Sequence, residues 1–449
     1  MPRTEMNTSD LIIIGCGPGG YNAAEYAAKQ GMSVVIFDGK HAGGTCLNEG
    51  CIPTKTFCHN ADTIESLRHA EELGITAEFK FDFSKLIERK DAIVQQLRSG
   101  VEALMSAPGI TFVHEDAHFK DDKIIVAGNQ EYTAANIIIA AGSSPAMPPI
   151  KGIDSSHVVS STELLDITQL PKHLCIIGGG VIGMEFASAF ASFGSQVTVV
   201  EFMKECLPTL DSDIAKRLRK SMEKRGVNFY LQSKVTEITG SGIVFERKGK
   251  TEEIEADIVL VAVGRKPNIE GLQLDNTSIA FDKRGITVDD RFQTNVKGIY
   301  AIGDINGKCM LAHAAEFQGL QVVNTLAGKE SHIRHEVMPS AVFTLPEVAS
   351  VGYTDQQCKD EGIEFKCRKG MYRSNGKALA LNETEGLVKL ITDGAGHIIG
   401  CQALGAHASD MVQEATALIN CGGTIEQLRN IIHIHPTLGE ILLSAANQD

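Results

Sequence analysis

Short apolar runs bounded by glycine or polar residues recur along the chain. The clearest lie at residues 10–14, 33–37, 174–177, 196–200 and 258–263. Continuous runs of this length, rich in Ile, Val and Leu, are typical of strands in a parallel sheet buried on both faces. Stretches with helical spacing, such as residues 21–30, alternate with them. The alternation predicts an α/β fold with parallel sheets.

The remaining apolar pattern divides into two parts. Residues 61–106 have the spacing of helices, with buried faces expected at Ile64, Leu67, Ile87, Ile93 and Leu97. Strand-like runs follow at residues 111–113, 124–126 and 137–140. After Pro339 the pattern changes to strands at 342–343, 386–391 and 398–403 and helices at 355–361 and 409–420. We therefore expect a separate α+β domain at the C-terminal end.

A glycine turn follows the first predicted strand. It places Gly15, Gly17 and Gly20 between that strand and a helix, and the next strand ends at Asp38, 18 residues past the last glycine. In a strand-turn-helix unit of this kind the glycines let the backbone approach a pyrophosphate, and the acid hydrogen-bonds a ribose. The unit predicts a dinucleotide site, with a purely structural glycine turn as the alternative.

A second unit repeats the first. Gly178, Gly180 and Gly183 follow the run at 174–177, and the next strand ends at Glu201, again 18 residues past the third glycine. Two copies with the same internal spacing indicate a protein with two nucleotide sites. A carboxylate at Glu201 accepts from the 2′-hydroxyl of NAD and repels the 2′-phosphate of NADP, and neither Phe202 nor Met203 supplies an arginine for that phosphate.

Cys46 and Cys51 lie five positions apart, just after the first nucleotide unit. In a regular helix their Cα atoms would be roughly 8 Å apart, beyond the roughly 7 Å limit for a disulfide. We therefore expect a locally distorted segment, which Gly50 and Pro53 permit. A reducible pair near the cationic Lys55, which favours a thiolate, predicts a working dithiol rather than two unrelated buried cysteines.

Composition narrows the class of protein. A chain of 449 residues suggests about three domains. Its 43% hydrophobic content, 22% charge and lack of a long apolar run are ordinary for a globular protein, and we expect no membrane span and a cytoplasmic location. Eleven cysteines without regular spacing suggest reduced thiols besides the special pair. A net charge of −14 argues against nucleic acid as a partner.

Residues 43–55, GGTCLNEGCIPTK, resemble the active-site segment of the pyridine nucleotide-disulfide oxidoreductases, a family of flavoproteins. The resemblance runs in family order from Asp10 to about Ala445. It implies two Rossmann-like dinucleotide-binding domains, for FAD and NAD, and a C-terminal α+β dimerisation domain. The implied boundaries are an FAD domain at 1–150, an NAD domain at 151–267, a return of the FAD domain at 268–338 and the dimerisation domain at 339–449.

The resemblance also assigns roles to residues. It implies that Cys46 exchanges with the substrate disulfide, that Cys51 lies against the flavin, and that Lys55 pairs with Glu185. The family's ATG-type turn is matched by residues 140–142, with alanine in place of the threonine, and Gly303-Asp304 matches its second FAD signature. The implied FAD residues are Gly15, Gly17, Gly20, Asp38, Lys55, Ala117, Ala141, Gly142, Ser143, Asp304, Met310, Leu311, Ala312 and His313. The implied NAD residues are Gly178, Gly180, Gly183, Glu185, Glu201, Val235 and Gly264. No metal site is expected.

His435 and Glu440 stand in the C-terminal sequence HIHPTLGE. A histidine near neutral pH serves as a base, and a nearby carboxylate orients it. By resemblance this pair reaches into the active site of a second subunit, which implies a homodimer. Within the family, oxidation of dihydrolipoyl groups with NAD is favoured over glutathione reduction by the run Met310–His313 and by Glu201. The expected partners are then the lipoyl-bearing subunits of 2-oxo acid dehydrogenase or glycine cleavage complexes. Another FAD-dependent disulfide reductase, or a flavoprotein interaction subunit with little catalysis, stays open as an alternative.

Overall fold

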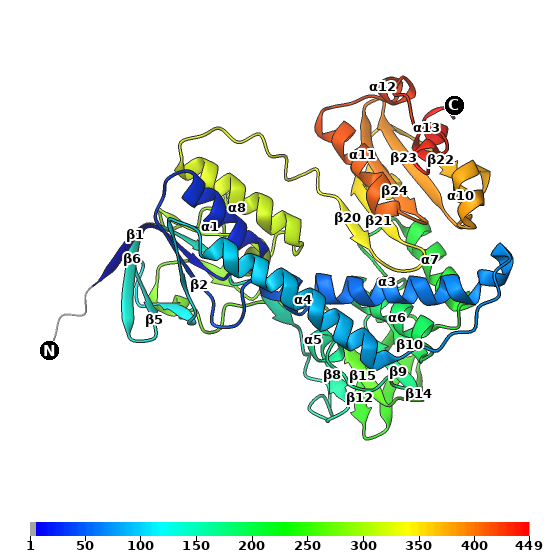
Figure 1. The fold of residues 1–449 in the computed structure, drawn as a ribbon, viewed down its shortest axis with the longest axis horizontal. Coiled ribbons are helices and arrows are strands. Elements are labelled where there is room, and N and C mark those ends of the chain that lie inside the picture. The colour runs from blue at the N-terminus through cyan, green and yellow to red at the C-terminus, as the bar shows by residue number, and fades with distance from the viewer. Residues whose placement is uncertain (1–5, 449) are drawn as a thin grey trace. The chain divides into compact units, whose positions relative to one another are not determined.

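The computed structural model describes residues 6–448, and the chain forms two compact units (Figure 1). Unit 1 contains the residues up to Thr56 together with Ser84–Ala146 and Gly264–Ile333. Unit 2 contains Phe57–Phe83, Met147–Val263 and the residues from Arg334 onward. The chain changes units within five residues of 150, 267 and 338, and it also changes units after Thr56 and after Phe83, inside the predicted FAD domain. The predicted NAD and dimerisation domains fall in the same unit.

Unit 1 is built on a largely parallel sheet with the order β3-β2-β1-β6-β5-β4, and with β19 also beside β6. The parallel strands are β1 (Asn7–Ile14), β2 (Val34–Phe37), β3 (Ile110–Val113), β6 (Gln130–Ile139) and β19 (Ile299–Ala301), and the antiparallel strands are β4 (Ala117–Phe119) and β5 (Ile124–Ala127). The central strands are buried on both faces, as their continuous apolar runs predict. Helix α1 (Pro18–Lys29) lies beside α8 (Ala312–Leu326).

The predicted helical region at 61–106 is wrong in its bounds and partly in its buried face. Helix α2 (Gly44–Asn48) precedes α3 (Cys51–Arg68), so α3 starts ten residues earlier than expected. A short turn, η1 (Ala70–Leu73), and a loop separate α3 from α4 (Phe83–Met105), with Gly74 in the left-handed region at φ +75°. Leu67 and Leu97 are exposed, because the buried stripe of α3 runs through Phe57, Ala61 and Ile64 and that of α4 through Leu86, Val94 and Val101.

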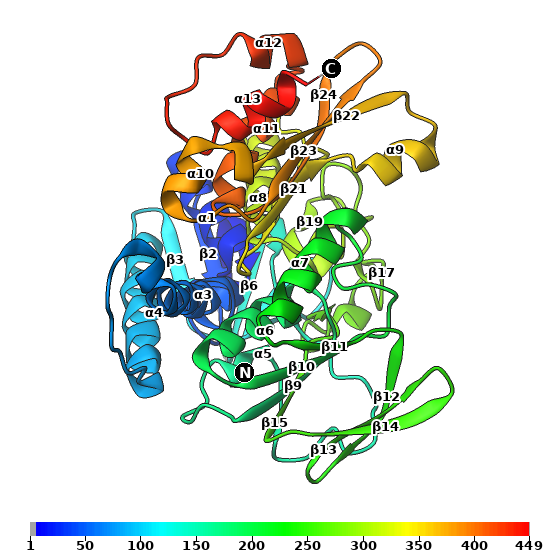
Figure 2. The same cartoon turned by 90° about the vertical axis from the view of Figure 1, so that its right-hand side faces the viewer.

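A second parallel sheet forms part of unit 2, with the order β11-β10-β9-β15-β8. Its strands are β8 (Val158–Val159), β9 (His173–Ile177), β10 (Gln196–Val200), β11 (Asn228–Tyr230) and β15 (Ile258–Val261). Figure 2 shows α6 (Val181–Phe193) against β9 and β10, and an antiparallel group formed by β12 (Ser233–Thr239), β13 (Gly242–Arg247) and β14 (Lys250–Glu255). Helix α7 (Ser212–Lys224) follows β10.

The C-terminal part of unit 2 is an antiparallel sheet with the order β20-β21-β24-β23-β22. Its strands are β20 (Ser340–Val342), β21 (Val348–Gly352), β22 (Phe365–Met371), β23 (Leu387–Asp393) and β24 (Ile398–Leu404). Helices α11 (Ala408–Asn420) and α13 (Glu440–Ala446) share an apolar core with Val388, Leu390 and Ala403 of the sheet. The helices α5 (Ser161–Leu164), α9 (Asp355–Glu361), α10 (Gly376–Leu381) and α12 (Ile425–Arg429) are short.

Within residues 6–448, no helix combines the length and the apolar character needed to cross a membrane.

Candidate active site

The first glycine turn has the close packing that requires glycine. Gly15 has φ +105°, and a Cβ there would lie 2.3 Å from the carbonyl oxygen of Ala140. A Cβ on Gly20 would lie 1.9 Å from the carbonyl oxygen of Gly15, so strand and helix meet closely. Gly17 differs, because the nearest heavy atom to a Cβ there is 3.9 Å away. The turn therefore leaves its backbone open at Gly17.

The second glycine turn repeats this geometry. Gly178 has φ +109°, and a Cβ on Gly183 would lie 2.1 Å from the carbonyl oxygen of Gly178. No heavy atom lies within 4 Å of a Cβ built on Gly180. In both turns the first and third glycines are needed by the fold, and the middle glycine faces open space that a pyrophosphate can approach.

The predicted ribose acids are tied to these turns. Asp38 accepts a hydrogen bond through Oδ2 from the backbone N–H of Cys16 at 2.8 Å. Glu201 accepts through Oε2 from the N–H of Gly179 at 2.5 Å and through Oε1 from the N–H of Met203 at 2.6 Å. A carboxylate has about four acceptor positions, so both side chains retain capacity for ribose hydroxyl groups.

The helices that follow the turns begin without a side-chain cap. Gly17 and Gly180 occupy the N-cap positions of α1 and α6 and provide no side-chain hydrogen bond. By contrast, Ser160, Asp211 and Thr354 cap α5, α7 and α9. The first N–H groups of α1 and α6 are thus directed to the open side of each turn, which fits a bound dinucleotide at both sites.

The dithiol segment is distorted as its spacing predicts. Helix α2 ends at Asn48 and α3 begins at Cys51, and Glu49 between them has φ −135°. Pro53 lies in the first turn of α3, where its missing N–H costs nothing. The thiol of Cys46 is hydrogen-bonded to Cys51, and this bond raises the pKa of Cys46 most. Burial raises that pKa further, and the charge of Lys55 lowers it. The two thiols are therefore in hydrogen-bond contact, as a pair that forms a disulfide requires.

Arg265 was missed as a site residue in the sequence. Its Nε donates to Ser143 Oγ at 2.7 Å, and Ser143 Oγ donates to Asp304 Oδ2 at 2.5 Å. Burial lowers the pKa of Arg265, while the charges of Asp304 and Cys51 oppose that shift. The guanidinium thus holds Ser143 and, through it, Asp304, one of the predicted FAD residues. The available signal in the sequence was the segment VGRKPN at 263–268, which contains the predicted end of the NAD domain at 267.

The other predicted FAD residues of unit 1 lie in three places. Asn268 Nδ2 donates to the carbonyl oxygen of Ala141 at 2.8 Å, and the backbone N–H of Asn268 donates to that of Gly142 at 3.0 Å. Ala117 is buried in β4. The run Met310–His313 leads into α8, whose N-cap Leu311 gives no side-chain hydrogen bond.

Besides Glu201, three predicted NAD residues lie outside the glycine turn. Glu185 is 3% exposed in α6, and its Oε1 accepts from the backbone N–H of Phe343 at 2.9 Å. Val235 lies in β12 next to a register shift. Gly264 begins the last segment of unit 1, with φ +123° and no heavy atom within 4 Å of a Cβ built there. Pairing of Glu185 with Lys55 stays a prediction.

The structure brings His435 and Glu440 together. Nδ1 of His435 lies 2.9 Å from Glu440 Oε1, and the His435 side chain is 79% exposed. The backbone N–H of Thr437 donates to Glu440 Oε2 at 2.8 Å, and this bond, followed by the one with His435, lowers the pKa of Glu440. Because an ionised carboxylate only accepts, Nδ1 of His435 carries the proton and Nε2 is left as the basic nitrogen.

Family models match most of the chain. The pyridine nucleotide-disulphide oxidoreductase model matches residues 9–319, and the dimerisation-domain model of the same family matches residues 338–446. The chain belongs to the pyridine nucleotide-disulphide oxidoreductase family. The α/β class and the C-terminal dimerisation domain expected from the sequence are confirmed for this family member.

Individual family members are similar over almost their whole length. The chain is 40% identical to a dihydrolipoyl dehydrogenase of Geobacillus stearothermophilus, over 98% of this chain and 95% of the relative. It is 38% identical to a mitochondrial dihydrolipoyl dehydrogenase of Pisum sativum, over 98% and 91%. Among solved structures, the HOCl-induced flavoprotein disulfide reductase RclA from Escherichia coli aligns with a TM-score of 0.88 at 30% identity, over 97% of this chain and 99% of RclA.

Proposed function

We propose that the chain is a dihydrolipoamide dehydrogenase, which oxidises protein-bound dihydrolipoyl groups to the lipoyl disulfide and reduces NAD to NADH. The full-length similarity to dihydrolipoyl dehydrogenases of a bacterium and of a plant mitochondrion carries this proposal. Two open glycine turns and the adjacent Cys46 and Cys51 sulfurs support it. The enzyme works as a homodimer, in keeping with the match to the family's dimerisation domain.

The dithiol performs the exchange with substrate. A dihydrolipoyl thiolate attacks Sγ of Cys46, the Cys46–Cys51 bond breaks, and Cys51 leaves as a thiolate. The second dihydrolipoyl sulfur then attacks the first, which releases the lipoyl disulfide and leaves Cys46 as a thiol. Two electrons have moved from substrate to the pair. The hydrogen bond between Cys46 and Cys51 supports this exchange, because it places the two sulfurs in contact.

His435 supplies the base for the first step. Its Nε2 takes the proton of the dihydrolipoyl thiol while Nδ1–H remains on Glu440, so the carboxylate stabilises the imidazolium that forms. The dyad acts on the dithiol of the partner subunit. This explains why a base can be largely exposed in one chain.

FAD, when bound, passes the two electrons from the dithiol to the nicotinamide ring. The turn of Gly15, Gly17 and Gly20 holds the FAD pyrophosphate, and Asp304, kept in place by Ser143 and Arg265, binds the ribityl chain. The turn of Gly178, Gly180 and Gly183 holds NAD, with Glu201 on its ribose. Lys55 and Glu185 tune the flavin. These assignments divide the chain into the FAD, NAD and dimerisation domains with the boundaries expected from the sequence.

The dihydrolipoyl group comes from lipoyl-bearing subunits of a 2-oxo acid dehydrogenase or glycine cleavage complex. We place the enzyme in the cytoplasm, where reduced thiols persist.

Steady-state assays of the FAD-loaded protein test the proposal. Dihydrolipoamide with NAD should give fast NADH formation, and oxidised glutathione with NADH or NADPH should give little turnover. Fast reduction of glutathione with no dihydrolipoamide oxidation would instead identify a different disulfide reductase. An FAD-loaded protein that is inactive with every combination of thiol or disulfide substrate and nicotinamide nucleotide would support the alternative of an interaction subunit with little catalysis.

A further inference from the structure

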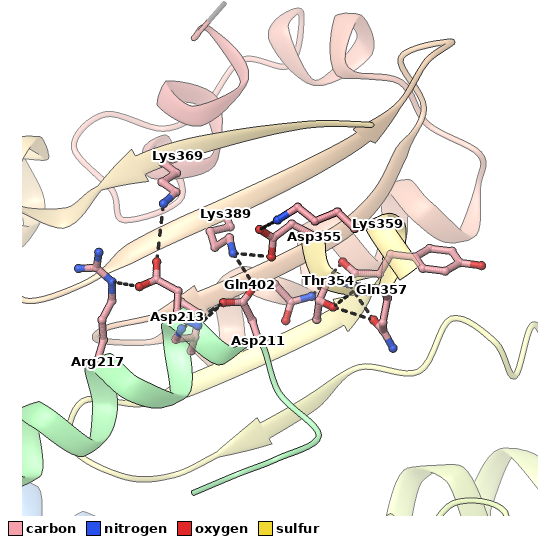
Figure 3. A network of polar contacts seen from close by, with 12 residues as sticks. Asp211, Asp213, Arg217, Thr354, Asp355, Gln357, Lys359, Lys369, Lys389 and Gln402 are labelled. Atoms are coloured by element: carbon pink, nitrogen blue, oxygen red, sulfur yellow. Dashed lines mark hydrogen bonds and ion pairs between the residues drawn. The ribbon is translucent and has the colours of Figure 1, made fainter. Parts of the chain in front are cut away.

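A lysine is buried between two carboxylates where the nucleotide fold meets the C-terminal sheet within unit 2. Lys389 of β23 has a side chain that is 3% exposed, and its Nζ lies 2.5 Å from Asp211 Oδ2 and 2.9 Å from Asp355 Oδ1 (Figure 3). The Asp211 side chain is 1% exposed. Charged groups are almost never buried to this degree unless they are paired, so each depends on the other.

Lys389 belongs to a row of polar side chains that crosses the whole C-terminal sheet. Residues paired directly across neighbouring strands share one face of a sheet. The register pairs Lys369 with Lys389, Lys389 with Gln402, Gln402 with Ser350, and Ser350 with Ser340. Helix α7 packs against β24 of this sheet. The strand residues that alternate with this polar row, such as Val388, Leu390 and Ala403, form the apolar core with α11 and α13. The contact with the nucleotide fold is therefore polar and directional.

Asp211 divides its two oxygens between two tasks. Oδ1 caps α7 by accepting from the backbone N–H groups of Asp213 at 3.0 Å and Ile214 at 3.1 Å. Oδ2 receives Lys389 from the C-terminal sheet. The start of α7 is thus held from the outside by a residue 178 positions later in the chain.

The segment that ends at Asp211 begins at Glu201, the predicted ribose acid. Within it, the backbone N–H of Leu207 donates to the carbonyl oxygen of Gly179 at 2.8 Å, so the segment borders the second glycine turn. Arg219 of α7 holds Glu205 with two hydrogen bonds, of 2.6 and 3.0 Å. One end of the 201–211 segment is therefore fixed by the glycine turn, and the other by α7 and Lys389.

We propose that Lys389 is a positioning residue for the pyridine nucleotide: through Asp211 it fixes the 201–211 segment that carries Glu201. The C-terminal sheet thereby sets the affinity of the neighbouring nucleotide site. Removing one partner of a buried ion pair leaves the other charge buried without compensation, so the segment that carries it must shift to reach other partners or water. This inference deepens the proposed function, because it takes the second glycine turn as the NAD site.

Two variants remove the link in different ways. Lys389→Met keeps the length and apolar stem of the lysine and removes its charge. Asp211→Asn keeps an oxygen acceptor for the cap of α7, a role that asparagine fills well, and removes the charge that Lys389 needs. The matched control is Lys369→Met, because Lys369 is the next residue in the same row and lies 3.6 Å from Asp213 of the same helix, but its side chain is 46% exposed.

The dissociation constant for NAD is measured by calorimetry on the FAD-loaded enzyme, with kcat and KM from steady-state assays. Lys389→Met and Asp211→Asn should each weaken NAD binding about tenfold, a common size for coupling through a positioned network. KM for NAD should rise by a similar factor, with kcat and the KM for dihydrolipoamide within about twofold of the unmodified values. Lys369→Met should stay within about twofold throughout.

An unchanged dissociation constant in FAD-loaded Lys389→Met overturns the proposal. If that variant does not fold, the same result in Asp211→Asn overturns it. An equal loss of kcat/KM for NAD and for dihydrolipoamide would indicate general damage to the enzyme. That result would also count against a positioning role. NAD binding by calorimetry needs no dithiol substrate, so a protein that binds NAD but does not oxidise dihydrolipoamide would refute the proposed function and leave this inference intact.

Discussion

Glu201 accepts a hydrogen bond of 2.5 Å from the backbone N–H of Gly179, the residue next to the first glycine of its own turn. Asp38 makes the same bond to Cys16 at 2.8 Å in the other nucleotide fold. The acid at the end of the second strand therefore holds the glycine turn, in addition to the ribose contact that we propose for it. A substitution at either acid affects both.

Nucleotide choice should depend on Glu201. A hydrogen bond to a charged group contributes about 1.5–3 kcal/mol and repulsion of a 2′-phosphate adds to it, so NAD should be preferred over NADP by a hundredfold or more in kcat/KM. Glu201→Arg should shrink or reverse that preference. It should also lower the efficiency with NAD, because the bonds to Gly179 and Met203 are lost.

Glu201→Gln is the control for that experiment, since it keeps an oxygen for the N–H of Gly179 while it removes the charge and the second acceptor, which serves Met203. It should keep most NAD activity and lose part of the discrimination. Equal kcat/KM for the two nucleotides in the unmodified enzyme would show that Glu201 does not face the ribose.

The two cysteines should differ in their spectra. Cys51→Ser should abolish the long-wavelength absorption of the two-electron-reduced enzyme, because Cys51 is assigned as the thiolate beside the flavin. Cys46→Ser should keep an absorbing thiolate, and alkylation of the reduced enzyme should modify Cys46 first. Absorbance spectra and peptide mass spectrometry provide the measurements, and the opposite pattern in the two variants would reverse the roles.

His435→Ala should lower turnover of dihydrolipoamide by about two to four orders of magnitude, the effect of losing a general base. Flavin content should not change. His397→Ala is a matched control, because His397 is another exposed histidine of the C-terminal domain, 3.1 Å from Asp393, and should keep normal rates.

Subunit exchange tests whether the base acts across the dimer. Mixing Cys46→Ser with His435→Ala subunits should restore one competent site in each heterodimer. Steady-state rates of the mixture that stay at the level of the separate variants would place His435 and the dithiol of the same chain in one site.

Asp62 of α3 should make stability depend on pH. Burial, and then the charge of Glu347, raise the pKa of Asp62 to about 6, with Glu383 and Glu65 adding to the shift and Arg225 opposing it. The folded state thus binds a proton that the unfolded chain releases above about pH 4. Ionised Asp62 consequently destabilises the fold at pH 8, and this cost shrinks as the pH falls from about 6 to about 4, where both states are protonated.

Asp62→Asn should therefore raise the melting temperature by a few °C at pH 8, and the gain should shrink to about half at pH 5. Circular dichroism melts at both pH values provide the measurement. Exposed Glu71 offers a control, since Glu71→Gln should change the melting temperature by about 1 °C or less at either pH. An equal gain from Asp62→Asn at both pH values would contradict the assigned ionisation.

Local sequence predicted the parts of the molecule that depend on neighbouring residues. The strand Gln196–Val200 and the helix Asp355–Glu361 have the predicted bounds, because apolar runs and capping residues act over a few positions. Both glycine turns were predicted because each needs glycine within six residues of chain. The break between Cys46 and Cys51 followed from helix geometry alone.

Other features arise from contacts between residues far apart in the chain. Arg265 meets Ser143, 122 positions away, and Lys389 meets Asp211 across 178 positions. Local periodicity does not predict such pairs, since the sequence around a buried, paired lysine or aspartate has the same pattern as the sequence around an exposed one. Leu67 and Leu97 were expected to be buried on spacing, yet both are exposed. Which face of a helix is buried depends on the surfaces that surround it, and those form only when the chain has folded.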